Sequence, residues 1–154
     1  MIKKILTYPE DIEILSQKSD YVAEINDDIK QLIQDLKDTL KADNSGVGLS
    51  AIQIGIPKRI CYINYAGEEL VLINPVIKWT RRGTQPFREG CLSSPGKYAI
   101  VNRPQKVICE YTNEDGVLCE IAEGGWMSAI IQHEMDHFEG ICQVYESTKE
   151  KINE

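Results

Sequence analysis

Histidine, positive charge and long apolar runs are all scarce in this sequence. Each shortage limits the classes of function or location that the chain can have. Only two of 154 residues are histidine, and both stand in one short stretch. Lysine and arginine number 17 against 24 acidic residues, which gives a net charge of −7. Without a positive excess there is little to displace counterions along a phosphate backbone, so we expect no direct nucleic-acid binding.

The scarcity of long apolar runs bears on location. No run could cross a bilayer, and the one after Lys3 and Lys4 is too short for the core of a secretory signal. The five cysteines are an odd number, which in such a chain favours free thiols in a reducing compartment. We therefore expect a cytoplasmic protein that binds no membrane, with a single domain over residues 1–154 and a core that needs no disulfides.

Both histidines lie in the stretch Gln132 to Gly140, which reads QHEMDHFEG. On an α-helix, residues i and i+4 project from one face, so His133 and His137 can bind one divalent metal. Glu134 lies on the flank of that face and can reach a metal-bound water, as a general base must. The predicted helix, 126–139, is apolar on most sides, so we expect its histidines to face the interior or a cleft. That burial disfavours the alternative, a chance match on a charged helix.

Two imidazoles leave a metal short of ligands, because a hydrolytic site needs a third plus water and a structural tetrahedral site needs two more. Cys91 is the best candidate for the third ligand, since a glycine and the predicted turn Ser93 to Gly96 frame it. Asp136 points away from His137, and we expect it to cap or to form a salt bridge. The other cysteines are expected to be small buried hydrophobes in strand-like runs: Cys61, Cys109, Cys119 and Cys142. Two imidazoles and one thiolate suit zinc, ferrous iron, nickel or cobalt and exclude calcium or magnesium.

The remaining pattern predicts an α+β fold in which the metal-binding helix packs among small antiparallel β-sheets. Apolar residues at helical spacing predict a second, amphipathic helix near the N-terminus, from Asn26 to Ala42. Runs rich in β-branched and aromatic residues predict five strands, over 59–64, 69–74, 76–80, 106–112 and 117–122. We expect the first two strands to form one hairpin and the last two to form another.

Four segments carry weaker signals. Residues 1–24 predict an extended arm with a short helical turn, 78–83 a basic loop, and 146–154 a tail that is either a frayed helix or disordered. The fourth, 46–55, begins with two glycines that admit a close backbone or ligand, and continues as a short strand. By itself it fits a plain turn into a buried strand equally well, with Gln53 as a satisfied polar group.

Three motifs together resemble, in order and spacing, those of the peptide deformylases: GVGLSAIQIG at 46–55, EGCLSSP at 89–95 and QHEMDHFEG at 132–140. The resemblance runs over most of the chain. Two departures are Ser50, where the family usually has alanine, and Phe138, where it usually has leucine. We expect neither to touch a catalytic atom. The chain also ends soon after the third motif, without the C-terminal helix with which many bacterial members dock on the ribosome, so the resemblance does not extend to ribosome docking.

The resemblance implies a metal site with water in the fourth position and three protein ligands: Cys91, His133 and His137. Family members are known as ferrous enzymes that also work with nickel, cobalt or, less well, zinc, so we expect Fe²⁺. The implied reaction removes the formyl group from the N-terminal formyl-methionine of new polypeptides and releases formate. Glu134 would take the proton of the water and pass it to the leaving amine. The metal, the Gln53 amide and the Leu92 backbone N–H would hold the oxyanion.

The resemblance also implies a substrate cleft for N-formyl-methionyl peptides and nascent chains. We expect the Gly46 to Gly48 backbone to pair with the extended substrate as an added strand, and Gly90 to line the same cleft. An apolar slot for the methionine side chain is predicted from three residues near the metal: Val47, Ala129 and Ile130.

Two other interpretations of the same residues stay open at this point. A metallopeptidase that cuts internal peptide bonds would take its third ligand from a glutamate or histidine, which would leave Cys91 dispensable. A non-catalytic metal-binding module would close the site with a fourth ligand, such as a second cysteine.

Overall fold

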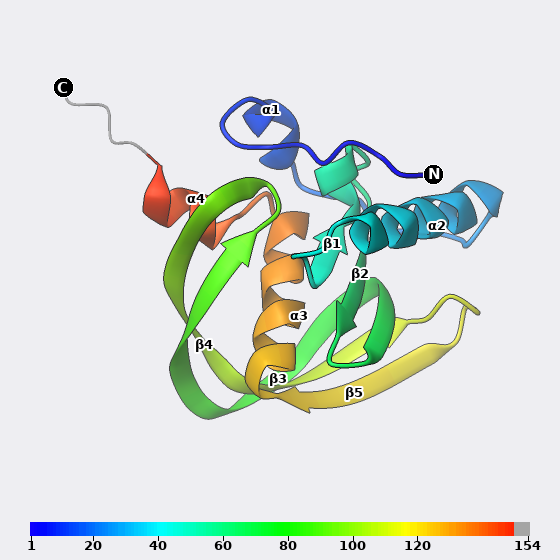
Figure 1. Cartoon of the computed structure of the whole chain (residues 1–154). Helices are drawn as coiled ribbons and strands as arrows, with labels where there is room; N and C mark the ends of the chain where they lie inside the picture. The colour runs from blue at the N-terminus through cyan, green and yellow to red at the C-terminus, as the bar shows by residue number, and fades with distance from the viewer. Residues whose placement is uncertain (150–154) are drawn as a thin grey trace.

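In the computed structural model, which describes residues 1–149, an antiparallel sheet bends around one central helix (Figure 1). The sheet has five strands in the order β1-β2-β3-β4-β5. In chain order the elements are α1 (Ile12–Leu15), α2 (Asp27–Ala42), β1 (Gly48–Ser50), the 3₁₀ helix η1 (Ala51–Ile54), β2 (Ile60–Tyr65), β3 (Glu68–Cys91), β4 (Ser94–Thr112), β5 (Leu118–Gly124), α3 (Gly125–Phe138) and α4 (Gln143–Thr148). This arrangement confirms the predicted α+β class.

Helix α2 forms where the apolar spacing predicts it. The Asn26 side chain caps it by accepting a hydrogen bond from the Ile29 backbone N–H at 3.0 Å. Its apolar stripe, which includes Leu36 and Leu40, packs in one core cluster with Leu49 and Tyr62. This cluster covers one end of the sheet and supports β1, the strand that carries the first motif. The short helical turn predicted before residue 24 is α1.

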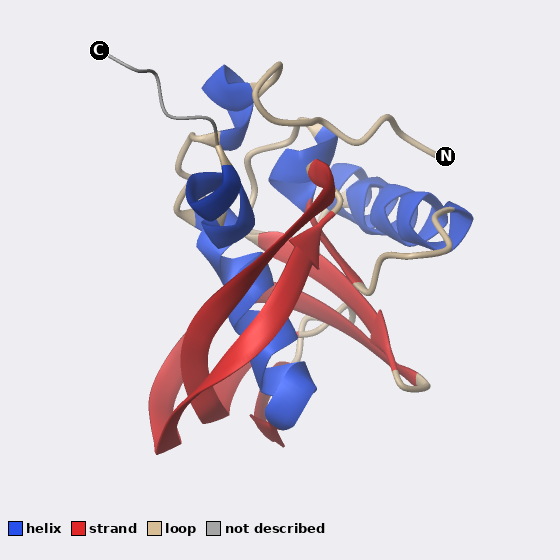
Figure 2. Cartoon of the chain, turned by 60° about the vertical axis from the view of Figure 1, so that its left-hand side comes forward, coloured by secondary structure: helices blue, strands red, loops and turns tan. Residues whose placement is uncertain are grey.

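Strand β3 is longer than predicted and includes two segments that were predicted as separate elements. The strand at 76–80 is the middle of β3, and the basic loop predicted at 78–83 is strand as well. Register shifts, beginning between Ile73 and Val76, let β3 bend without losing its pairing with β4. Asn74 stabilises the first bend, since its carboxamide exchanges two hydrogen bonds of 2.9 Å with the Val22 backbone. The resulting long ribbon runs past the central helix (Figure 2).

The turn between β3 and β4 is centred two residues before the predicted turn, Ser93 to Gly96. It is formed by Leu92 and Ser93, and Cys91 pairs with Ser94 across it, so the Pro95 region belongs to β4. Tertiary contacts fix this position. The Ser93 carbonyl accepts a hydrogen bond from the Tyr8 backbone N–H at 2.8 Å, and the Ser93 hydroxyl accepts one from the Gln53 side chain. As a result Cys91 stands at the end of a strand, next to the helix that carries the histidines.

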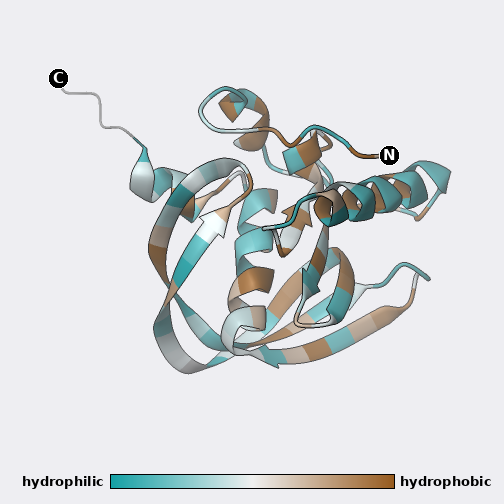
Figure 3. Ribbon diagram, viewed as in Figure 1, coloured by the Kyte–Doolittle hydropathy of each residue, from teal (hydrophilic) through white to brown (hydrophobic). Residues whose placement is uncertain are grey.

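Helix α3 begins and ends one residue before the predicted 126–139. Gly140, at φ 74°, closes it through an N–H bond to the His137 carbonyl. A Cβ at Gly140 would lie 2.2 Å from the Ser16 carbonyl oxygen, so only glycine fits there. Ile131 and Phe138 bury this helix against the sheet. Half-buried positions of β5 alternate with exposed ones. Figure 3 shows hydrophobic and hydrophilic residues mixed along the same strand.

The cysteines other than Cys91 are free thiols, and three of them are buried. Cys61 and Cys109 lie in strands, as predicted, whereas Cys119 is only half-buried. The strand prediction for Cys142 is wrong, because this residue immediately precedes α4 and packs in a cluster with Cys91. Residues 146–148 of the tail predicted to be a frayed helix or disordered belong to helix α4; positions 150–154 of that prediction lie outside the described residues. No helix within residues 1–149 is both long and apolar enough to span a membrane.

Candidate active site

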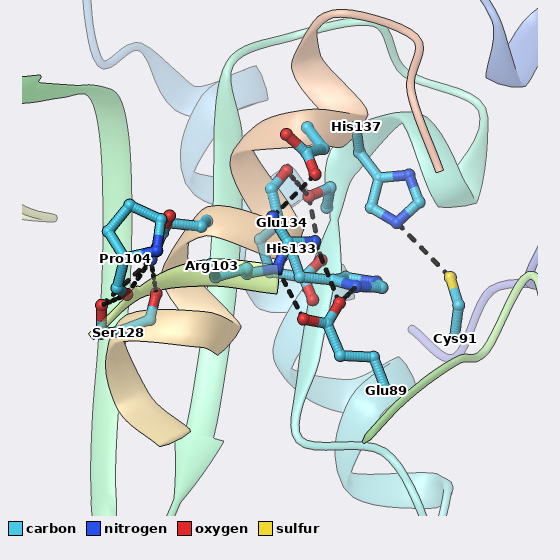
Figure 4. Close-up of polar contacts among 11 residues, drawn as sticks. Glu89, Cys91, Arg103, Pro104, Ser128, His133, Glu134 and His137 are labelled. Carbon is cyan, nitrogen blue, oxygen red and sulfur yellow. Dashed lines mark hydrogen bonds and ion pairs between the residues drawn. The ribbon is translucent and has the colours of Figure 1, made fainter. Parts of the chain in front are cut away.

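Three parts of the chain meet at one place: the end of β3, the C-terminal half of α3, and β1 with η1. Cys91 comes from β3, and His133 and His137 come from successive turns of α3 (Figure 4). One ligand atom from each residue lies within 4.8 Å of the other two. The Cys91 Sγ and His137 Nε2 atoms are 3.4 Å apart. Helical spacing and a strand end thus bring one thiol and two imidazoles to a common point.

The chemistry of these three side chains fits a divalent transition metal. The Nδ1 atom of His133 is held by Glu89, which leaves Nε2 for an ion. The Nδ1 atom of His137 is buried with no partner in the described part of the chain. Burial lowers the pKa of His137 well below its ordinary value, which keeps the ring neutral, as a ligand must be. No further histidine, cysteine or carboxylate within residues 1–149 joins the group, and Cys142 stays outside it.

A buried carboxylate orients the His133 ring. Glu89 accepts a hydrogen bond from His133 Nδ1 at 2.9 Å and two more from the Arg103 guanidinium at 2.5 and 2.9 Å. Although burial opposes the charge on Glu89, the bonds from His133 and Arg103 lower its pKa. Arg103 also pairs with Asp136 at 3.0 Å, the salt bridge expected of that residue. The sequence offered no signal for Arg103, which pairs with Glu89 across 14 residues of the hairpin.

Replacing Glu89 by glutamine should weaken metal binding by about 10- to 100-fold, because a neutral amide holds the His133 ring less firmly and makes it less basic. Titration of the metal-free protein with Co²⁺ against a competing chelator measures the change. Glu110→Gln, which removes an ion pair with Lys78 at the surface of the sheet, is the matched control. Equal affinities for Glu89→Gln and wild type would remove Glu89 from the support of the metal site.

The Glu134 carboxylate is almost fully buried against β1, and burial raises its pKa. Its Oε1 atom accepts a hydrogen bond from the Ser50 hydroxyl at 3.1 Å. Ser50, which we expected to touch no catalytic atom, therefore contacts the residue predicted to act as the base. The reason is tertiary: β1 runs beside α3 and turns the Ser50 side chain toward it. Phe138, the other departure, is fully buried in the core cluster of α3 and the sheet.

Gln53 faces the same point from η1. Its Oε1 atom accepts from the Ser50 backbone N–H at 2.9 Å. Its Nε2 atom donates to the Ser93 hydroxyl at 3.0 Å and lies 3.7 Å from the Cys91 sulfur. The amide group is thus aimed at the Cys91 side chain. Leu92 stands immediately after Cys91 in the turn, half-buried at the same place.

A cavity of about 460 Å³ opens over this constellation. Its lining contains Gln53, Cys91, His133 and Glu134. It also contains all six residues predicted to contact substrate: Gly46, Val47, Gly48, Gly90, Ala129 and Ile130. The sequence did not indicate the contributions of Arg88, Lys97 and Tyr98, which come from the β3–β4 hairpin. Polar groups with metal-ligand chemistry thus stand at one wall of a partly apolar cleft, an arrangement typical of a hydrolase.

The model of the polypeptide deformylase family matches residues 2–152. The chain belongs to this family. A peptide deformylase of Maricaulis maris is 38% identical over 145 residues, which cover 91% of this chain and 82% of the relative. The crystal structure of a deformylase from Legionella pneumophila superposes with a TM-score of 0.86 at 36% identity, covering 92% of this chain and 83% of the other. A Synechococcus elongatus deformylase in complex with actinonin gives 0.83 at 36% identity, with coverages of 90% and 74%.

Membership defines the reaction. Deformylases are metal-dependent hydrolases that remove the formyl group from the N-terminal formyl-methionine of newly made polypeptides, and this chain is one of them. The two other interpretations, a peptidase for internal bonds and a purely structural metal module, are thereby wrong. Which site residue performs which step of this reaction is a separate question.

Proposed function

We propose that this deformylase binds one divalent ion, Fe²⁺ in its working form, through Cys91, His133 and His137. The cluster of one half-buried thiol and two buried imidazoles around a common point carries this proposal. A bound ion supplies Lewis acidity, which polarises a carbonyl and lowers the pKa of a water molecule. Ni²⁺ and Co²⁺ suit the same ligands, and so does Zn²⁺.

Metal identity is tested by loading the metal-free protein, without oxygen, with each ion in turn and measuring formate release from a formyl-methionyl peptide. The proposal expects the Fe²⁺, Ni²⁺ and Co²⁺ forms to turn over faster than the Zn²⁺ form at equal occupancy. If the Zn²⁺ form were the fastest, Fe²⁺ would be the wrong assignment while the deformylase reaction itself would stand.

Glu134 is the proposed proton carrier. Its carboxylate lies in the cavity wall beside His133, where it can accept a proton from the attacking water and deliver it to the leaving amine. Because burial raises its pKa, the protonated form costs less near neutral pH than it would for an exposed glutamate. Gln53 and the Leu92 backbone N–H are the proposed donors to the oxyanion.

Gln53→Ala should lower kcat by about 100-fold, with a much smaller rise in KM, because an oxyanion donor acts mainly in the transition state. Steady-state formate release over a range of substrate concentrations measures both constants. Gln132→Ala is the control, since that amide bonds the Pro104 carbonyl rather than the site, and it should stay close to wild type. A kcat for Gln53→Ala within a few-fold of wild type would remove Gln53 from the mechanism.

The proposed substrate lies extended along β1. This strand is at the edge of the sheet, so its outer backbone groups can pair with a peptide in the way that an added strand does. Residues Gly46 to Gly48 would supply that edge, and Gly90 lines the cavity close to Cys91. The apolar slot for methionine would be formed by three lining residues: Val47, Ala129 and Ile130.

Ala129→Phe should cut kcat/KM for a formyl-methionyl peptide by roughly tenfold or more, because the ring would fill the slot while the metal ligands stay in place. A formyl-glycyl peptide, which needs no slot, is the internal control and should lose much less. Metal content measured in parallel should stay at wild type. An unchanged rate with formyl-methionyl substrate would take this face of α3 out of the slot.

Nascent chains carrying formyl-methionine are the proposed cellular substrates, and the cytoplasm is the proposed location. The net charge of −7 supports action without direct nucleic-acid contact.

A further inference from the structure

We propose that the Ser50 hydroxyl is a positioning group for deformylation, which holds the Glu134 carboxylate at the angle that proton transfer requires. The inference rests on the proposed role of Glu134. It gives β1 a second role. Besides offering its edge to the substrate, the strand holds the side chain of the proposed base, Glu134.

The contact is direct and buried. Ser50 has no exposed surface, and its Oγ lies 2.9 Å from the Glu134 main-chain oxygen and 3.1 Å from Oε1, across 84 residues of sequence. In the described part of the chain, Ser50 is the one hydrogen-bond donor that this carboxylate has. The bond is to a group that is charged for part of the cycle, and such bonds are stronger than those between neutral groups.

The second carboxylate oxygen is confined by Gly48, two residues earlier on the same strand. A Cβ at Gly48 would lie 2.6 Å from Oε2 and 3.0 Å from Cδ of Glu134. The carboxylate therefore lies against bare backbone on one side and is bonded by Ser50 on another. These two restraints from β1 leave it little freedom to turn about its own axis.

The position of Ser50 separates it from substrate. Gly48 and Glu134 line the cavity, but Ser50 does not. Its side chain can therefore affect turnover only through another residue. Its backbone N–H, which bonds Gln53 Oε1 at 2.9 Å, is unchanged by substitution of the side chain. Ser50→Ala thus removes the contact with Glu134 and keeps the bond from the Ser50 backbone to Gln53 Oε1. It also removes the capping contact that the hydroxyl accepts from the Gln53 backbone N–H, and this second loss is the same with or without Glu134.

The test is a double-mutant cycle on formate release, with nickel-loaded wild type, Ser50→Ala, Glu134→Gln and the double variant. Loss of one hydrogen bond to the base should lower kcat about tenfold in Ser50→Ala, with little change in KM. In the Glu134→Gln background the same substitution should cost almost nothing, because the base it serves is gone. Ser128→Ala, which removes a buried hydroxyl from α3 that bonds Pro104, should keep the wild-type kcat.

A structural role for Ser50 would give a different pattern. Equal losses in both backgrounds, or a wild-type kcat in Ser50→Ala, would overturn the inference. If Ser50→Ala did not fold, Ser50→Cys, similar in size and a weaker donor, would go through the same cycle with the same two criteria. Wild-type turnover that Glu134→Gln abolishes establishes the proposed function independently, so failure of the Ser50 inference is distinguishable from failure of that function.

Discussion

Glu134→Gln should lower kcat for formate release on the order of 1,000-fold while the protein still binds one equivalent of metal. Glutamine has nearly the same volume, so its packing against Gly48 survives, but its amide cannot take a proton from water. Because Glu134 is not among the three clustered ligand residues, occupancy should stay at the wild-type level. Steady-state formate release and metal analysis of the same preparation measure the two quantities.

Glu139→Gln serves as the matched control for that substitution. This glutamate follows the same helix, but it pairs with Arg59 at the surface and faces no part of the cavity. It should turn over at the wild-type rate. A Glu134→Gln protein that keeps most of its activity would mean that another group moves the proton. If it lost its metal instead, the carboxylate would belong to the ligand set.

Cys91→Ser should weaken metal binding by about 100-fold or more, beyond the effect expected for Glu89→Gln, because it removes a thiolate ligand rather than the support of one. Activity should fall with occupancy. The change is followed in the cobalt-substituted protein, where one thiolate ligand gives a sulfur-to-metal absorption band that the serine variant should lack.

Cys142→Ser is the control for the cysteine experiment. This buried thiol packs in a cluster with Cys91 but does not join the group of ligand atoms. The variant should keep one equivalent of metal and the cobalt band of a single thiolate. If Cys142→Ser weakened that band and Cys91→Ser kept part of it, both thiols would bind the metal, and the proposed three-ligand site would be wrong.

Local patterns in the sequence account for the two long helices, α2 and α3. The apolar spacing after Asn26 and the glycine at 140 define the two long helices to within a residue. The long strand β3 was divided in the prediction because its bends look like chain breaks. They are bulges whose pairing continues on β4, and only the partner strand reveals that continuity.

The residues of the site likewise fall into two groups. Some are predicted by a local sequence pattern, and others depend on contacts between distant segments of the chain. The spacing of His133 and His137 follows from helix geometry, and the glycine before Cys91 marked an unusual cysteine. Arg103 had no local signal, because its contact with Glu89 depends on how β4 is paired with β3. Ser50 belonged to a recognised motif, yet its contact with Glu134 depends on how β1 lies beside α3, which no sequence spacing gives.

Formate release from a formyl-methionyl tripeptide by the nickel-loaded protein, run beside an unformylated peptide that can be cut only at internal bonds, is the most direct test of the proposed mechanism. We predict repeated turnover of the formylated substrate and no cleavage of the other, with turnover nearly abolished in both Glu134→Gln and Cys91→Ser. A wild-type protein that holds one equivalent of nickel and releases no formate, or a Glu134→Gln variant as fast as wild type, would contradict it.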